Sequence, residues 1–294
     1  MHTRSRRITR LNQGLRRFSD DEIIIEAPME IVVNGVPWAA LMRTPGDDEA
    51  LALGYCHTEG LLQQGEPYSM NRCTAADGTM RMLLEIQGGP RRVQEMMRGR
   101  GVRMGFSCCG NRNAVSAQEL VRTLPPVPSS GPADNKEAFR VAPETLNALL
   151  REAEGYQALF SRTGGTHFCA LYDGQLTMLA FAEDTGRHNA LDKAAGQALM
   201  QGTAADVHLV LLSSRLSFEM VQKSLALKAR VVAGLSAVTS MGTELAEASG
   251  ITLVGFLRSG RMNIYTHAQR MVAACDGTTP CSGPAESCPL RRPS

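Results

Sequence analysis

Three apolar runs of strand length constrain the fold of this chain more than any other feature of its sequence. Each run is continuous instead of alternating with polar residues, which is typical of strands buried on both faces of a parallel sheet. Apolar residues at helical spacing fill the segments between them. The expected strands are Val207–Leu212, Val231–Leu235 and Ile251–Phe256, and the helices between them Ser217–Ala229 and Met241–Ser249. The pattern predicts an α/β core with right-handed crossovers and a ligand beyond the carboxyl ends of the strands.

Further elements are expected on the amino-terminal side of these runs. The dipeptides Asn34-Gly35 and Asp173-Gly174 each lie between strand-like segments and predict hairpins within 26–38 and 166–181. Turn residues and acidic residues after Thr44 indicate a helix that ends at Gly60. The remaining expected elements are a strand at 81–86 and helices at 143–156 and 189–200.

Composition divides the chain into five segments. Residues 125–138 are rich in Pro, Ser and Gly and poor in apolar residues, as expected of a linker or long loop. The predicted organisation is a basic disordered tail at 1–21, a smaller N-terminal β-rich subdomain at 22–124 with a cysteine loop and the helix after it, the linker at 125–138, the α/β core at 139–270, and a Cys-containing disordered tail at 271–294.

The charge balance gives no general case for nucleic-acid binding, because 31 basic residues face 29 acidic ones and the net charge is +2. Six arginines lie within the first 17 residues, which lack the apolar core of a secretory signal. A solvated tail is expected there, with an anionic partner or a transit-like role as the alternative. No apolar run reaches the roughly 18 residues that a membrane span needs. We expect a soluble, cytoplasmic protein that binds neither nucleic acid nor a membrane.

Eight cysteines are present, but a chain of 294 residues does not need disulfides to fold. Cys56, Cys73 and Cys169 lie in apolar or strand-like stretches and are expected to be reduced. The tail cysteines, Cys275, Cys281 and Cys288, are spaced too widely for a zinc knuckle. We favour incidental cysteines in a disordered end over a redox or sulfur-relay element or an adventitious metal site, and expect neither zinc nor another bound metal.

The adjacent cysteines Cys108 and Cys109 are the candidate reactive residues. They lie in a segment of small and polar residues that is typical of a surface loop, and Arg103 and Arg112 favour the thiolate over the thiol. A thiolate in a loop can accept, carry and pass on sulfur. The alternative is that both are small, half-buried apolar residues, as free cysteines often are.

Polar residues follow each of the three predicted parallel strands, in the segments 213–219, 236–242 and 256–261. Hydroxyl and amide groups at helix starts can hold phosphate oxygens, and arginines add charge-assisted hydrogen bonds. The residues concerned include Ser213, Ser214, Arg215, Ser217, Arg258 and Arg261. They predict an anionic, phosphorylated ligand; the alternative is helix capping by the serines with solvated arginines. The glycine patterns of dinucleotide-binding and P-loop enzymes are missing from the sequence.

Two histidines lie beside glycine and threonine at element boundaries. His167 ends Thr163-Gly-Gly-Thr-His, and His188 lies within Glu183–Lys193. An imidazole at such a place can move protons near neutral pH, although a hydrogen-bonded structural role is the alternative for both. Their separation of 21 residues does not match a zinc motif, so metal catalysis is not expected.

Several of these segments, in this order, resemble the FdhD/NarQ family of formate dehydrogenase accessory sulfur carriers. The resemblance spans residues 22 to 270. The segments that carry it are Glu26–Ile31, Met42–Gly54, Thr163–His167, Glu183–Lys193, Ser217–Gln222 and Gly255–Arg261.

The resemblance implies a cytidine-deaminase-like α/β core without the deaminase zinc. It also implies that the protein takes sulfur from a cysteine desulfurase and transfers it to the molybdenum cofactor, in its bis(molybdopterin guanine dinucleotide) form, before insertion into formate dehydrogenase. The sulfur would travel as a persulfide on a loop cysteine. By resemblance the cofactor-binding segment is Phe256, Leu257, Arg258, Ser259, Gly260 and Arg261, to which the reading of the loops and histidines adds Ser214, Arg215, His167 and His188.

The cysteine segment departs from the family pattern Ser-Cys-Gly-x-Cys-Gly. An ungapped match makes Cys109 the persulfide carrier and puts Arg112 at the position of the second family cysteine, whereas a deletion would make Cys108 the carrier. We rank Cys109 first. A vicinal pair closes only a strained disulfide, so Cys108 is expected to be a poor resolving thiol.

Three matters stay open at this level. The altered motif also suits a cofactor-binding chaperone that moves no sulfur, and the cysteines could serve a redox or zinc-dependent regulator. Whether the carrier acts as a sulfurtransferase enzyme, and whether it forms a homodimer, does not follow from the sequence.

Overall fold

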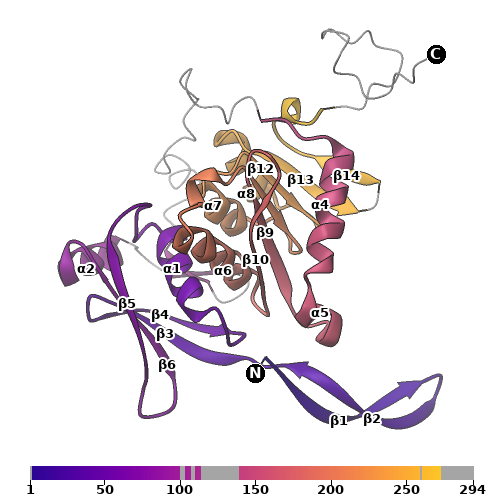
Figure 1. Cartoon of the computed structure of the whole chain (residues 1–294), viewed down its shortest axis with the longest axis horizontal. Helices are drawn as coiled ribbons and strands as arrows, with labels where there is room; N and C mark the ends of the chain where they lie inside the picture. The colour runs from indigo at the N-terminus through magenta and orange to yellow at the C-terminus, as the bar shows by residue number, and fades with distance from the viewer. Residues whose placement is uncertain (1, 100–102, 107–109, 114–138, 259, 273–294) are drawn as a thin grey trace.

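The computed structural model describes residues 2–99, 103–106, 110–113, 139–258 and 260–272. Cys108, Cys109, Ser259, the predicted linker at 125–138 and the tail cysteines lie outside the described residues. The described part contains a large sheet with helices on both faces, a smaller N-terminal sheet, and a projecting hairpin (Figure 1).

The large sheet has six strands in the order β10-β9-β11-β12-β13-β14. Its centre is parallel, as predicted, because the continuous apolar runs form neighbouring strands in register. The outer strands pair antiparallel, so the sheet is mixed. The strands are β9 (His167–Tyr172), β10 (Met178–Asp184), β11 (Leu209–Leu212), β12 (Val231–Gly234), β13 (Thr252–Arg258) and β14 (Arg261–Ile264).

Helices cover both faces of this sheet, which confirms the two-sided burial expected from the apolar runs. One face packs against α6 (Arg187–Met200), α7 (Phe218–Ala226) and α8 (Ser240–Ala248). The other packs against α4 (Pro143–Gly155), which is followed by α5 (Ala158–Thr163). Two 3-10 turns, η1 (Ala204–Asp206) and η2 (Ala268–Arg270), complete the core. In the described part of the chain, no helix combines the length and apolar character that a bilayer crossing requires.

The N-terminal sheet has four strands in the order β4-β3-β6-β5. Its hairpin at Asn34-Gly35 is confirmed, with both residues at positive φ. The strands are β3 (Ala27–Val33), β4 (Val36–Arg43), β5 (Tyr68–Thr74) and β6 (Met80–Ile86), and the helices are α1 (Asp48–Thr58) and α2 (Gly89–Gly99). Helix α1 shares a core with this sheet and packs lengthwise on α6, so it joins the two sheets.

The expectation of a disordered tail at residues 1–21 is wrong. Strands β1 (Thr3–Asn12) and β2 (Leu15–Ile24) form a long antiparallel hairpin. Its turn at Gln13 and Gly14 has positive φ at both residues, which matches the twist of the strands. Near the base, arginines of β1 lie opposite acidic residues of β2, as in the pairs Arg6–Asp21 and Arg7–Asp20. Cross-strand charge pairing replaces the apolar pattern from which strands are usually recognised.

Short strands flank the candidate cysteines. β7 (Arg103–Phe106) and β8 (Gly110–Asn113) pair antiparallel. Residues 103–106 and 110–113 are therefore strands, whereas the sequence predicted a loop there.

Candidate functional site

Polar loops gather at one edge of the large sheet, where β11, β12 and β13 end. The loops are bonded to one another: Leu216 N donates to Ala237 O at 2.9 Å, Thr239 N to Leu216 O at 3.1 Å, and Phe256 N to Ser236 O at 3.0 Å. Because β9 runs antiparallel to β11, and β10 antiparallel to β9, the start of β9 and the end of β10 lie at this same edge. We call residues 167, 187–188, 213–217, 235–239, 256–258 and 260–261 the strand-end surface.

Three helices begin at this surface: α6 at Arg187, α7 at Phe218 and α8 at Ser240. The first turns of helices carry unbonded N–H groups and a partial positive charge, which attract anions. Only the α8 start has a side-chain cap, in which Gly242 N donates to Thr239 Oγ1 at 3.2 Å. The edge therefore combines three positive helix ends, of which the sequence analysis placed only those after β11 and β12 at this edge.

Ser213, Ser214 and Ser217 form no helix-capping hydrogen bond, so the alternative that these serines cap helices is wrong. Ser213 Oγ accepts from Phe168 N at 2.9 Å and lies 3.1 Å from His167 Nδ1. Ser214 is buried and its hydroxyl donates to Arg215 O. Ser217 precedes α7 without a capping bond, and its hydroxyl is buried with no hydrogen-bond partner among the described residues. Arg215 is exposed.

The two candidate histidines come together at the strand-end surface although they are 21 residues apart. His167 pairs with Asp184 across the β9–β10 hairpin, and His188 lies one turn beyond that strand end in α6. Burial lowers the pKa of His167, and the nearby basic side chains of Arg187 and His188 lower it further. His167 is therefore a neutral imidazole near neutral pH, beside two basic side chains.

His188 also faces the start of α7. Its Nε2 lies 2.8 Å from Glu219 Oε2, a distance within ion-pair range but without hydrogen-bond angles. Both side chains are mostly buried, at 17% and 8% exposure. The contact links the first turns of α6 and α7.

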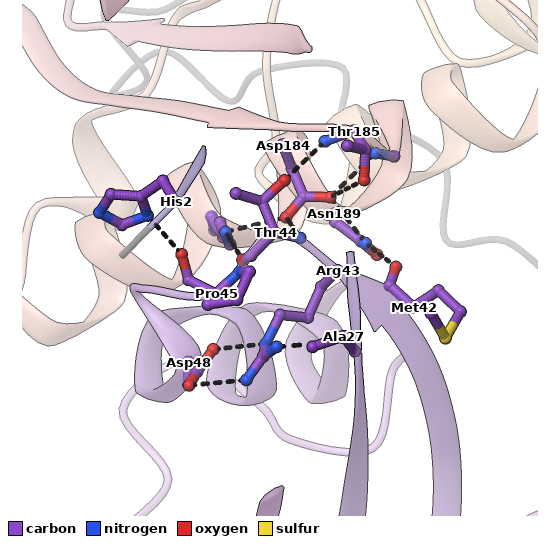
Figure 2. A network of polar contacts seen from close by, with 12 residues as sticks. His2, Ala27, Met42, Arg43, Thr44, Pro45, Asp48, Asp184, Thr185 and Asn189 are labelled. Atoms are coloured by element: carbon purple, nitrogen blue, oxygen red, sulfur yellow. Dashed lines mark hydrogen bonds and ion pairs between the residues drawn. The ribbon is translucent and has the colours of Figure 1, made fainter. Parts of the chain in front are cut away.

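A buried network around Asp184 fixes the start of α6, and sequence reasoning missed it (Figure 2). One carboxylate oxygen accepts from Gly186 N at 2.8 Å and Asn189 Nδ2 at 3.0 Å. The other accepts from Thr44 N at 3.0 Å and pairs with Lys193 Nζ at 2.8 Å. Asp184 is completely buried, so these partners replace its hydration. The only signal in the sequence was a charged cluster at the end of a predicted hairpin.

Glu183, the neighbour of Asp184, organises the segment before His167. Its carboxylate accepts from Leu159 N and Phe160 N at the start of α5, each at 2.8 Å, and from Thr166 Oγ1 at 2.7 Å. These bonds fix the segment that leads into β9. Asp184 thus positions the start of α6, and its neighbour Glu183 positions the segment that leads to His167.

The segment Phe256–Arg261 is divided between the core and the surface. A bulge in β13 puts Phe256 at φ +51° with 38% exposure, while the next residue, Leu257, is completely buried. Leu257 therefore cannot contact a ligand with its side chain, contrary to its place in the expected set. Arg258, Gly260 and Arg261 are exposed.

Arg258 and Arg261 lie opposite each other in the β13–β14 hairpin. Like charges at directly paired positions destabilise a sheet unless an anion lies between them. An anionic ligand between these two arginines stays a prediction.

The described thiols are free, as expected: Cys56 and Cys169 are buried and Cys73 is exposed. Burial raises the pKa of the Cys169 thiol, which makes it unreactive. Within the described ranges, no three His, Cys, Asp or Glu side chains form a group that could hold a metal ion.

Comparisons with known proteins agree with this architecture. The crystal structure of a formate dehydrogenase accessory protein from Desulfotalea psychrophila matches with a TM-score of 0.70 at 22% identity, over 92% of this chain and 100% of that one. Curated relatives named sulfur carrier protein FdhD include one from Streptomyces coelicolor, 36% identical over 280 residues, covering 92% of this chain and 95% of the relative. Another, from Variovorax paradoxus, is 34% identical over 261 residues, covering 88% and 90%. The model of the FdhD/NarQ family matches residues 24–272, and together with these relatives it shows that the chain belongs to that family.

Proposed function

We propose that the protein is a sulfur carrier in formate dehydrogenase maturation. It takes sulfur from a cysteine desulfurase as a persulfide on Cys109, with Cys108 as the alternative, and passes it to the molybdenum cofactor in its bis(molybdopterin guanine dinucleotide) form. Family membership and the names of the relatives support the sulfur-carrier role. The observation that most supports binding of the cofactor is the convergence of three helix starts with basic side chains at one sheet edge.

The strand-end surface would hold the cofactor as cargo by its phosphates and its ring systems. N–H groups of the helix starts, with Arg258 and Arg261, suit phosphate oxygens. The exposed ring of Phe256 suits stacking against a guanine or pterin plane. Ser217 Oγ and Arg187 Nε, both buried without a partner among the described residues, would gain one from the ligand after a small rearrangement.

The carrier step needs a thiolate that attacks the outer sulfur of the desulfurase persulfide. A new S–S bond forms on Cys109 while the desulfurase cysteine leaves as a thiolate, so no external oxidant is required for loading. The strands β7 and β8 hold the ends of this segment together. Three finer expectations belong to the same proposal: a cytidine-deaminase-like arrangement of the core, action in the cytoplasm, and a homodimer.

Intact mass spectrometry after incubation with a cysteine desulfurase and cysteine tests the proposal. We expect a reducible gain of about 32 Da, one sulfur atom, in the wild type and Cys108→Ala but not in Cys109→Ala. Cys73→Ala is the matched control, because Cys73 is the exposed thiol of the described residues.

Two other outcomes lead elsewhere. Loss of the mass gain only in Cys108→Ala moves the carrier by one residue. No gain in any form with active desulfurase rejects sulfur carriage and favours a chaperone that holds the cofactor without moving sulfur.

A further inference from the structure

The hairpin of β1 and β2, which we call the arm, projects away from the rest of the molecule (Figure 1). Its strands pair with each other and with no other described strand. The base is fixed on two sides: Arg162 of α5 lies 2.6 Å from Glu22 and bonds Thr3 Oγ1 at 2.9 Å, and His2 Nδ1 lies 2.7 Å from Pro45 O. The arm therefore has a defined origin and direction, and the side-chain contacts of its outer part, such as the Arg10–Asp21 ion pair and Arg7 over the Phe18 ring, lie within the hairpin itself.

The outer arm is strongly cationic. Residues 8–19, beyond the Arg7–Asp20 pair, contain three arginines and no acidic residue. Arg10 and Arg17 lie directly opposite each other, and Arg10 also pairs with Asp21 at 3.1 Å. Two like charges at paired positions disfavour the free hairpin and favour binding of an anion beside Arg17. The three are Arg10, Arg16 and Arg17.

Large apolar side chains are exposed on the same part of the arm. Leu11, Leu15 and Phe18 are 66–71% exposed. The pairing register puts Leu11 and Phe18 on one face and Leu15 on the other, and both faces also carry arginines. An isolated two-stranded hairpin is marginally stable in water, so an apolar, cationic arm of this length is expected to be buried by a partner.

The distribution over both faces identifies the shape and chemistry of that partner. A flat surface, such as a lipid bilayer, would contact one face and leave the other exposed. Exposed leucine and phenylalanine together with arginine are typical of protein interfaces, and guanidinium groups pair with carboxylates in bidentate geometry. Asp20, Asp21 and Glu22 near the base would repel the phosphates of a nucleic acid. We propose that the arm inserts into an acidic cleft of a protein partner.

The base of the arm lies beside elements that position the strand-end surface. Arg162 and the close contact of Ile24 with Gly165 place the base against the segment that leads to His167. On its other side, Pro45 follows Thr44, which bonds Asp184 before α6. A partner cleft that takes in the arm as far as its base would therefore lie next to this surface. The arm would then dock an enzyme that exchanges sulfur or cofactor with this protein, a step that rests on the proposed function.

Charge reversal in the full-length protein tests the arm. The variant is Arg16→Glu with Arg17→Glu, which keeps the hairpin because the carboxylate introduced at position 17 would lie opposite Arg10. The control is Arg72→Glu with Arg91→Glu, an equal charge change at two exposed positions of β5 and α2. The probes are a purified cysteine desulfurase and a purified cofactor-free formate dehydrogenase, each titrated separately at low and high salt. Circular dichroism checks that both variants are folded.

We expect the arm variant to bind at least one enzyme about tenfold more weakly than the wild type at low salt, with a smaller difference at high salt. The control should stay within about twofold. Persulfide loading at saturating desulfurase should be the same in all three proteins, which separates docking from sulfur chemistry.

Unchanged binding of both enzymes by the arm variant, or no binding of either by the wild type, would overturn the inference. A loss confined to an RNA duplex, phosphatidylglycerol vesicles or self-association would also overturn it, in favour of those partners. Absence of persulfide in the wild type, by contrast, would reject the proposed function and leave the docking result to stand on its own.

Discussion

Gly54 in α1 lies against the backbone of Gly196 in α6, so that a Cβ atom at Gly54 would be 2.7 Å from Gly196 N and 1.8 Å from Asp192 O. The converse also holds, because a Cβ at Gly196 would be 1.8 Å from Ala50 O. Gly54→Ala should therefore lower the free energy of unfolding by about 3 kcal/mol or more, since backbone and not a flexible side chain must move. Urea denaturation of the variant measures the loss.

The matched control is Gly155→Ala at the end of α4. A Cβ at Gly155 meets nothing within 4 Å, and its φ is not positive. Alanine should be neutral or stabilising there, by up to about 1 kcal/mol. Equal effects at Gly54 and Gly155 would show that α1 and α6 do not pack as closely as described.

A buried ion pair joins α1, α6 and α7. Lys223 Nζ lies 2.9 Å from both carboxylate oxygens of Asp192 and 2.8 Å from Thr58 Oγ1. Burial raises the pKa of Asp192, while the charge of Lys223 opposes that rise. Lys223→Met should cost about 3–5 kcal/mol, because it leaves two buried carboxylates, Asp192 and Glu59, without their cation. The double variant with Asp192→Asn should recover part of the loss in the same denaturation experiment.

An exposed ion pair gives the comparison. Arg10 and Asp21 are 3.1 Å apart on the arm with 59% and 41% of their side chains exposed. Arg10→Gln should change the free energy of unfolding by less than about 1 kcal/mol. A cost for Lys223→Met as small as this would contradict the role of the buried pair.

Two histidines make stability depend on pH. Burial is the main cause of a lowered pKa in both His57 and His167, below the ordinary value of 6.5. As the pH falls through 6.5, these two histidines bind protons in the unfolded chain but remain neutral in the folded protein. The free energy of unfolding therefore decreases. Thermal melts between pH 7.5 and 5.5 should show this decrease.

The variant with His57→Gln and His167→Gln should show a shallower decrease over the same range. The raised pKa of Asp192 acts in the opposite sense, but it does so in both proteins and cancels in the comparison. Parallel pH profiles of the wild type and the variant would contradict the assignment.

The sequence predicted the central strands because burial on both faces requires continuous apolar residues, as in β11 and β12. It did not predict the arm, whose strands are stabilised by opposed charges. Strand β14 and helix α2 were also missed, since β14 is largely exposed and α2 opens with Gly-Pro. Short or exposed elements have no apolar period to recognise.

The strand-end surface was predictable in part for a related reason. Parallel strands end at one edge, so the loops after β11, β12 and β13 had to meet. The contact between His167 and Ser213 depends on the antiparallel pairing of β9 with β11, which no local pattern specifies. Leu257 was included by resemblance, but the bulge in β13 turns it into the core.

Phe256 combines unfavourable backbone geometry with an exposed aromatic ring. A φ of +51° costs a residue with a Cβ about 1–2 kcal/mol that glycine does not lose. Phe256→Gly should therefore leave the free energy of unfolding within about 1 kcal/mol of the wild type or raise it, because relief of strain offsets the loss of a partly exposed side chain. If the ring stacks on the ligand, the same change should weaken binding of guanosine diphosphate, measured by calorimetry, about tenfold or more. Phe256→Leu should lose affinity without gaining stability, and Leu257→Ala should lose about 2–5 kcal/mol of stability because Leu257 is in the core. Wild-type affinity in Phe256→Gly would remove Phe256 from the binding surface and leave its strained backbone without a functional reason.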